Sequence, residues 1–142
     1  MMGFFSKLFG KGEELPLLDA SSPAKAILEK HMAELDPFVA KMHDRLEFLP
    51  TEATVYCFIG KPPAMFGMAW FSEGVEHNMK TMAAAKGLSP KKLQHLSMKL
   101  GEVYQKYLAE PRYVTEISGK QVIVTPADAF VKDVVDVRHP VE

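Results

Sequence analysis

The stretch that most constrains the fold is TVYCFIGKPPAMFGMAWF, residues 54–71. It is strongly apolar, and Gly60-Lys61-Pro62-Pro63 interrupts it near its middle. Successive side chains of a β-strand point to opposite faces, and here both faces of both halves are apolar. Strands of this kind are central in a sheet and are covered on both sides. The stretch therefore predicts two neighbouring strands, with the rest of the chain packed around them.

Small residues in the second of these strands predict that another part of the molecule approaches closely. Gly67 and Ala69 lie on one face of the strand, and Trp70 lies on the other. A helix packed against the small residues is one interpretation. The alternative is an apolar pocket with Gly67 and Ala69 as its floor and Trp70 and Tyr56 as its walls, as a ligand carrier or an enzyme would have.

A long N-terminal helix is predicted to begin after Ser22, a good N-cap, with Pro23 at the first helical position. Its apolar residues recur at alternating spacings of four and three: Leu28, Met32, Leu35, Val39, Met42, Leu46 and Leu49. Pro37 falls inside this pattern, so we expect a kink or a new helix start there. The stripe favours a helix lying on the sheet, and a dimer seam is the alternative.

Two further helices are predicted in the middle of the chain, from Glu73 to Lys86 and from Pro90 to near Glu110. Gly87 is suited to end the first helix. Ser89 is a good N-cap for the second. The second helix carries an apolar stripe of Leu93, Leu96, Leu100, Val103 and Tyr107.

This helix pair also carries a motif. Ala83, Gly87 and Leu93 have the spacing of a DNA-binding helix-turn-helix, and AAAKGLSPKKLQHL resembles the turn region of helix-turn-helix regulators. The resemblance implies a winged-helix-like regulator that uses residues 74–125, with YVTEISGKQVIVT as the wing. Its DNA contacts would be Lys86, Lys91, Lys92, His95, Lys99 and Lys120. Against this, any tight αα-hairpin closed by glycine satisfies the spacing, and a net charge of −1 is not typical of DNA-binding domains.

Residues 113–117 and 121–125 predict a second hairpin, at the edge of the sheet. Residues 127–138 predict a short helix, although their β-branched valines leave a strand as the alternative. The expected fold is a two-layer α+β domain. It has a mostly antiparallel four-stranded sheet of two hairpins, packed with the long N-terminal helix and the central αα-hairpin.

Residues 1–20 predict a flexible amphipathic tail and linker before a single domain of residues 21–142. A short helix over MMGFFSKLFGK would place apolar residues on one side, where they could touch a membrane peripherally: Phe4, Phe5, Leu8 and Phe9. Docking of these residues on the domain or on a partner is favoured, because two lysines attract a membrane weakly. No apolar run reaches the ~18–20 residues needed to span a bilayer.

No signature of catalysis is present. The chain lacks the motifs of serine hydrolases, zinc proteases, nucleotide-binding loops and Cys-x-x-Cys redox sites, so we expect no catalytic residue, cofactor or metal. Cys57 is the single cysteine, which predicts an inert core thiol and a reducing, cytoplasmic compartment. Glu73 and His77 have helical i,i+4 spacing and could share a metal, but acidic residues at a helix start explain them better.

The composition, 47% hydrophobic and 25% charged, is ordinary for a globular domain. We therefore expect a bacterial-type, non-enzymatic domain that acts by binding, as a homodimer or through a protein partner. The DNA-binding regulator and the carrier or enzyme with a pocket near Trp70 are the alternatives.

Overall fold

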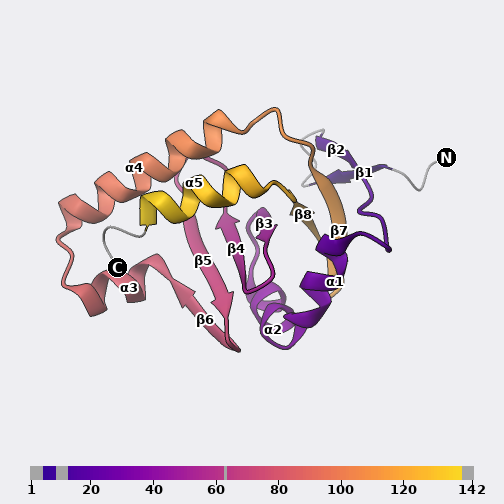
Figure 1. The fold of residues 1–142 in the computed structure, drawn as a ribbon, viewed down its shortest axis with the longest axis horizontal. Helices are drawn as coiled ribbons and strands as arrows, with labels where there is room; N and C mark the ends of the chain where they lie inside the picture. Colours follow the sequence, from indigo (N-terminus) through magenta and orange to yellow (C-terminus); the bar gives the residue numbers. More distant parts are fainter. Residues whose placement is uncertain (1–4, 9–12, 63, 139–142) are drawn as a thin grey trace.

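The computed structural model describes residues 5–8, 13–62 and 64–138. These residues form a six-stranded sheet with helices on both faces (Figure 1). The strand order is β6-β5-β4-β3-β8-β7. The strands are β3 (Leu46–Pro50), β4 (Thr54–Ile59), β5 (Gly67–Ser72), β6 (Val75–Asn78), β7 (Tyr113–Ile117) and β8 (Lys120–Val124). The α+β class is confirmed, but the sheet has more strands than the four predicted, and three layers replace two.

The apolar stretch of residues 54–71 forms two adjacent antiparallel strands, β4 and β5, as predicted. Both strands are buried through their middle residues. Cys57 and Phe71 belong to the core on one face of the sheet, and Phe58 and Trp70 belong to the core on the other. Because both faces are apolar, each needs its own layer of helices.

Two helices, α1 (Pro23–Lys30) and α2 (Met32–Lys41), cover the first face. Leu28, Leu35 and Val39 are buried against the sheet, so these residues of the predicted stripe leave no dimer seam there. The prediction of one long helix was wrong. The first helix stops at His31, and the chain leaves α2 after Lys41, whereas no break occurs at Pro37 within α2.

The end of the predicted stripe is the strand β3. Leu46 faces α1 and α2, whereas Leu49 faces the opposite core, because an odd spacing on a strand places two residues on opposite faces. All five residues of β3 are buried. Their spacing therefore continued the helical pattern by coincidence.

The second face is covered by α3 (Met79–Lys86), α4 (Pro90–Lys106) and α5 (Asp128–Arg138). Residues 128–138 are therefore helical, as predicted. The prediction that α3 starts at Glu73 was wrong, because Val75–Asn78 forms the edge strand β6. Asn78 caps α3 by accepting a hydrogen bond from the Thr81 backbone nitrogen at 2.9 Å. Glu73 and His77 consequently lack the helical spacing that a shared metal would use.

The second hairpin, β7–β8, is present, but only β7 is an edge strand. β8 lies between β7 and β3 and has three consecutive buried residues, Val122, Ile123 and Val124. It pairs with β3 in parallel, through Glu47 with Ile123 and Phe48 with Val124, whereas every other adjacent pair in this sheet of the described residues is antiparallel. The hairpin is thereby joined to the N-terminal half of the chain.

Near the N-terminus, β1 (Phe5–Leu8) and β2 (Glu13–Pro16) form a small antiparallel sheet. The helix predicted to include Phe5 and Leu8 was therefore wrong there, and Phe4 and Phe9 lie outside the described residues. Leu18 donates a backbone hydrogen bond to Val114 of β7 at 2.8 Å. The division into a tail and a domain remains a prediction.

Candidate anion-binding cleft at Trp70

A cleft of about 520 Å³ lies where β5 and β6 meet α3 and the end of α5. Basic and hydroxyl side chains converge on an apolar floor there. The lining residues are Thr54, Trp70, Ser72, His77, Thr81, Met82, Ala85, Lys86 and Arg138. None of these nine carries a carboxylate, and Lys86 and Arg138 bring positive charge to the cleft.

Strand pairing and helix ends position the basic groups around Trp70. His77 is the cross-strand partner of Trp70, and their rings stack with centroids 5.9 Å apart. Arg138 is the last residue of α5, and its Cζ lies 4.6 Å from the centroid of the Trp70 ring. Its Nη2 also donates a hydrogen bond to the Tyr56 hydroxyl at 3.2 Å. Two aromatic side chains therefore hold the guanidinium at the wall of the cleft.

The four residues of the predicted apolar pocket do not line one cavity. Tyr56 and Trp70 belong to the core beneath α3, α4 and α5. Gly67 and Ala69 line a separate hollow of about 340 Å³ beside β5, together with Phe38 of α2. Of the predicted four, the basic cleft is lined by Trp70 alone.

The predicted DNA contacts separate into two groups. Lys91, Lys92, His95 and Lys99 are exposed on α4, and Lys86 lies at the end of α3, where it also lines the Trp70 cleft. The wing is missing from their side, because β7 and β8 occupy the opposite half of the sheet from β5 and β6, which α3 contacts.

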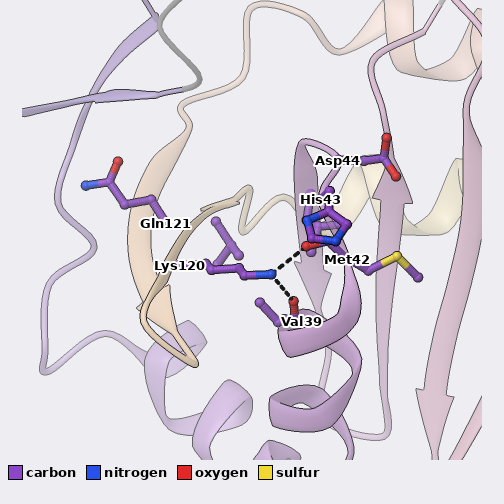
Figure 2. Close-up of a pocket in the computed structure, with 8 residues that line it drawn as sticks. Val39, Met42, His43, Asp44, Lys120 and Gln121 are labelled. Atoms are coloured by element: carbon purple, nitrogen blue, oxygen red, sulfur yellow. Dashed lines mark hydrogen bonds between the residues drawn. The ribbon is translucent and has the colours of Figure 1, made fainter.

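Lys120, the first residue of β8, has a different partner, the carboxyl end of α2 (Figure 2). Its Nζ donates hydrogen bonds to the backbone carbonyls of Val39, Ala40 and Met42 at 3.2, 3.0 and 2.7 Å. The Val39 carbonyl also accepts a hydrogen bond from the Met42 backbone nitrogen at 3.1 Å, and the ammonium group adds a charged donor to the carbonyls at this helix end. Lys120 is therefore a helix cap and does not lie with the α4 lysines.

A second polar cluster is buried under α4 and centres on Glu47, whose side chain is inaccessible to solvent. Its Oε1 accepts hydrogen bonds from the Tyr104 hydroxyl at 2.6 Å and from Arg45 Nη1 at 3.3 Å. Its Oε2 accepts hydrogen bonds from Arg112 Nε at 2.8 Å and from Thr125 Oγ1 at 2.6 Å. We call these five residues the Glu47 cluster.

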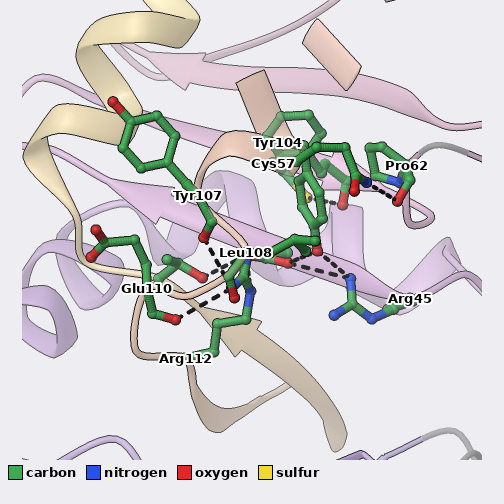
Figure 3. Close-up of polar contacts among 12 residues, drawn as sticks. Arg45, Cys57, Pro62, Tyr104, Tyr107, Leu108, Glu110 and Arg112 are labelled. Carbon is green, nitrogen blue, oxygen red and sulfur yellow. Dashed lines mark hydrogen bonds and ion pairs between the residues drawn. The ribbon is translucent and has the colours of Figure 1, made fainter. Parts of the chain in front are cut away.

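The Glu47 cluster joins parts of the chain that are far apart in sequence. Arg112 also donates from Nη1 to the carbonyls of Tyr107, Leu108 and Glu110 just after α4 (Figure 3). Burial, followed by the negative charge of Glu47, raises the pKa of Tyr104 to about 12. The phenol therefore stays protonated and donating at neutral pH. Full burial and saturated hydrogen bonding of Glu47 indicate a structural cluster and not a ligand site.

Other chemistry finds little support among the described residues. Burial raises the pKa of the Cys57 thiol well above its usual range, as expected for an inert core thiol. Within residues 5–8, 13–62 and 64–138, no group of three or more His, Cys, Asp or Glu could hold a metal ion. In the same part of the chain, no helix combines the length and apolarity needed to cross a bilayer.

Comparisons with protein-family models, with curated proteins and with solved structures find no match to this chain. Function is therefore inferred from the geometry and chemistry of its own sites.

Proposed function

We propose that this chain is a binding domain and that its Trp70 cleft holds a small anionic ligand. The observation that carries the proposal is the lining of the cleft. His77, Lys86 and Arg138 come from three different elements and converge on one hollow. Since no lining residue among those the structure describes is acidic, an anion gains charge-assisted hydrogen bonds without repulsion from them.

The rest of the lining restricts what else the ligand contains. Trp70, Met82 and Ala85 form an apolar surface beside the basic side chains, and three hydroxyl groups add neutral hydrogen-bonding partners. The volume of about 520 Å³ suits a small organic molecule. The fitting class is an organic phosphate or carboxylate with a compact apolar or planar part.

The test is ligand-induced stabilisation. Thermal unfolding is followed with inorganic phosphate, phenyl phosphate and benzoate, and hits are titrated by calorimetry. A ligand at 100 times its Kd stabilises the folded state by about 2.7 kcal/mol, so a clear rise in Tm is expected.

Lys86→Gln should weaken binding several-fold without harming the fold, because Lys86 is exposed. Lys30→Gln, on the opposite side of the sheet, is the matched control and should bind normally. Equal loss in both variants, or no stabilisation by any anion, would reject the proposal.

Self-association is a second candidate, favoured by two exposed methionines. Met65 is 97% exposed and Met98 is 57% exposed, and both line a hollow of about 600 Å³ between α4 and the loop before β5. Methionine adapts its shape easily and is common on protein-binding surfaces. We propose a second copy of the chain as the occupant. Sedimentation velocity should then give twice the 15.9 kDa chain mass, and Met65→Ser with Met98→Ser should return it to the monomer. A monomeric wild type at high micromolar concentration would end this idea.

A further inference from the structure

Positive charge is concentrated in one segment of the chain. Residues 77–101 contain five lysines, at positions 80, 86, 91, 92 and 99, and no aspartate or glutamate. This segment therefore carries a formal charge of +5. The remaining 12 basic and 18 acidic residues leave the rest of the chain at −6, so the near-neutral total conceals a strong separation of charge.

Part of this charge forms a line along α4. Lys91, His95 and Lys99 follow each other at i, i+4 and i+8, so they lie on one side of the helix, with Lys92 beside them. All four are exposed, and the side chains of the three lysines have no hydrogen bond or ion pair with the described residues. From Lys91 to Lys99 the line extends roughly 12 Å at the helical rise. We call these four residues the α4 basic stripe.

We propose that the α4 basic stripe binds the phosphate backbone of a nucleic acid without reading its bases. Lysine is a compact, flexible point charge that suits phosphate, and several unpaired lysines in line match a ligand whose charges repeat. Base readout in a groove relies largely on bidentate contacts from arginine, asparagine or glutamine, and the stripe contains none of these.

The surroundings of α4 favour a nucleic acid over a membrane. An amphipathic helix that binds a bilayer inserts its apolar side. The apolar side of α4 is instead buried in the molecule through Leu96, Leu100 and Tyr104. Contact at the stripe is therefore electrostatic, and α4 keeps its place on the sheet. Because no wing flanks it, the helix binds by its side and sequence-independently.

The experiment measures fluorescence anisotropy of labelled mixed-sequence oligonucleotides, one double-stranded and one single-stranded, with the full chain in 50 mM salt. We expect binding with a salt dependence set by about three phosphate contacts, so affinity between 50 and 200 mM salt should fall roughly 40-fold for the duplex and roughly 20-fold for the single strand. Exchange of all three stripe lysines, Lys91→Glu, Lys92→Glu and Lys99→Glu, should weaken binding more than tenfold. Comparison of the affinities for the double-stranded and the single-stranded oligonucleotide shows which form of nucleic acid the stripe prefers.

A matched control carries the same change in charge elsewhere, Lys30→Glu, Lys41→Glu and Lys132→Glu, at three exposed lysines outside α4. It should bind within about threefold of the wild type. Equal weakening in both triple variants, salt-independent binding, or no binding at 50 mM salt would overturn the inference. Tighter binding to vesicles with 30% phosphatidylserine than to either oligonucleotide would overturn it in favour of a membrane. Lys86→Gln, which tests the cleft, should leave oligonucleotide binding within about threefold, so the two proposals fail independently.

Discussion

Glu47 shows how a charged residue can be accommodated at the centre of a sheet. Removing a carboxylate from water is costly, and partner charges offset this cost when their geometry is good and every lone pair is used. Here two arginines and two hydroxyl groups donate to the two carboxylate oxygens. The residues come from β3 and its preceding loop, α4, the loop before β7 and the end of β8, so the cluster fixes how these elements meet.

Replacing Glu47 with alanine should be among the most destabilising single changes. The substitution leaves the side chains of Arg45 and Arg112, 11% and 8% exposed, without their carboxylate. Breaking a buried ion pair in this way costs roughly 3–5 kcal/mol. Urea denaturation should show this loss in the free energy of unfolding. Glu116→Ala, at an exposed position on β7, is the control and should change it by less than about 0.5 kcal/mol.

Tyr104 should make stability sensitive to alkaline pH. Its pKa in the folded state, about 12, is above the ordinary value of 10.0. The stabilisation from its neutral form is therefore fully present below pH 10 and is lost as pH rises through 12. The free energies of unfolding of the wild type and of Tyr104→Phe, taken from denaturation curves, should converge as pH rises from 10 to 12. Phenylalanine does not ionise, so the variant does not lose this stabilisation. If the difference in free energy of unfolding between the wild type and Tyr104→Phe stayed constant from pH 8 to 11.5, the raised pKa of Tyr104 would be contradicted.

At the scale of elements, the turn between α3 and α4 depends on backbone conformation. Gly87 ends α3 with φ of 66°, in the left-handed region that glycine adopts without strain. Gly101, by contrast, is inside α4, and a Cβ there would meet Phe66 at 3.7 Å, an ordinary contact. The two glycines therefore have opposite roles in stability.

Alanine substitutions should separate these roles. Gly87→Ala should destabilise by roughly 1 kcal/mol, because a side chain disfavours positive φ. Gly101→Ala should stabilise by about 0.5–1 kcal/mol, because alanine is the better helix former and space is available. Thermal and urea unfolding of both variants measures the signs. If Gly101→Ala destabilised the chain, the packing of Phe66 against α4 would have to be tighter than described.

The local sequence pattern predicts the helices and strands in which the apolar residues recur with the period of that element alone. β4 and β5 were predictable because alternation along residues 54–71 is apolar on both faces, and α5 because Pro126 and Asp128 suit a helix start. β3 was not, because Leu46 and Leu49 continue a helical spacing and its second residue, Glu47, is charged. The partners that allow Glu47 to be buried, Arg112 and Thr125, are distant in sequence, and no local pattern shows that they meet.

The candidate cleft was predictable only around Trp70. An aromatic residue in an apolar strand indicates a possible pocket wall at Trp70. Because side chains alternate between the two faces of a strand, however, Trp70 lies on the opposite face from Gly67 and Ala69. The sequence pattern places His77 in a helix and Arg138 at the end of the separate helix predicted over residues 127–138. Their convergence depends on the β5–β6 pairing and on where α5 ends, both of which are tertiary properties.

At the scale of the whole molecule, the sheet separates two cores that share no buried side chain in the described residues. α1 and α2 complete one core, and α3, α4 and α5 complete the other. The candidate cleft and the α4 basic stripe belong to the second side. The surfaces proposed for binding therefore lie on this second side of the sheet.

The parallel pairing of β3 with β8 makes the folding order of the chain testable. β4 and β5 are close in sequence and can pair early, whereas Phe48 meets Val124 only after a long loop closes, which costs entropy before any contact is gained. We expect the β3–β8 contact to form after the folding transition state. In stopped-flow measurements Val124→Ala should mainly speed unfolding, and Val55→Ala in the β4–β5 pair should also slow folding. If Val124→Ala and Val55→Ala slowed folding equally, the β3–β8 contact would already be formed in the folding transition state. If the order holds, the stability of the C-terminal hairpin governs how long the native state survives, while the β4–β5 pair governs how fast it is reached.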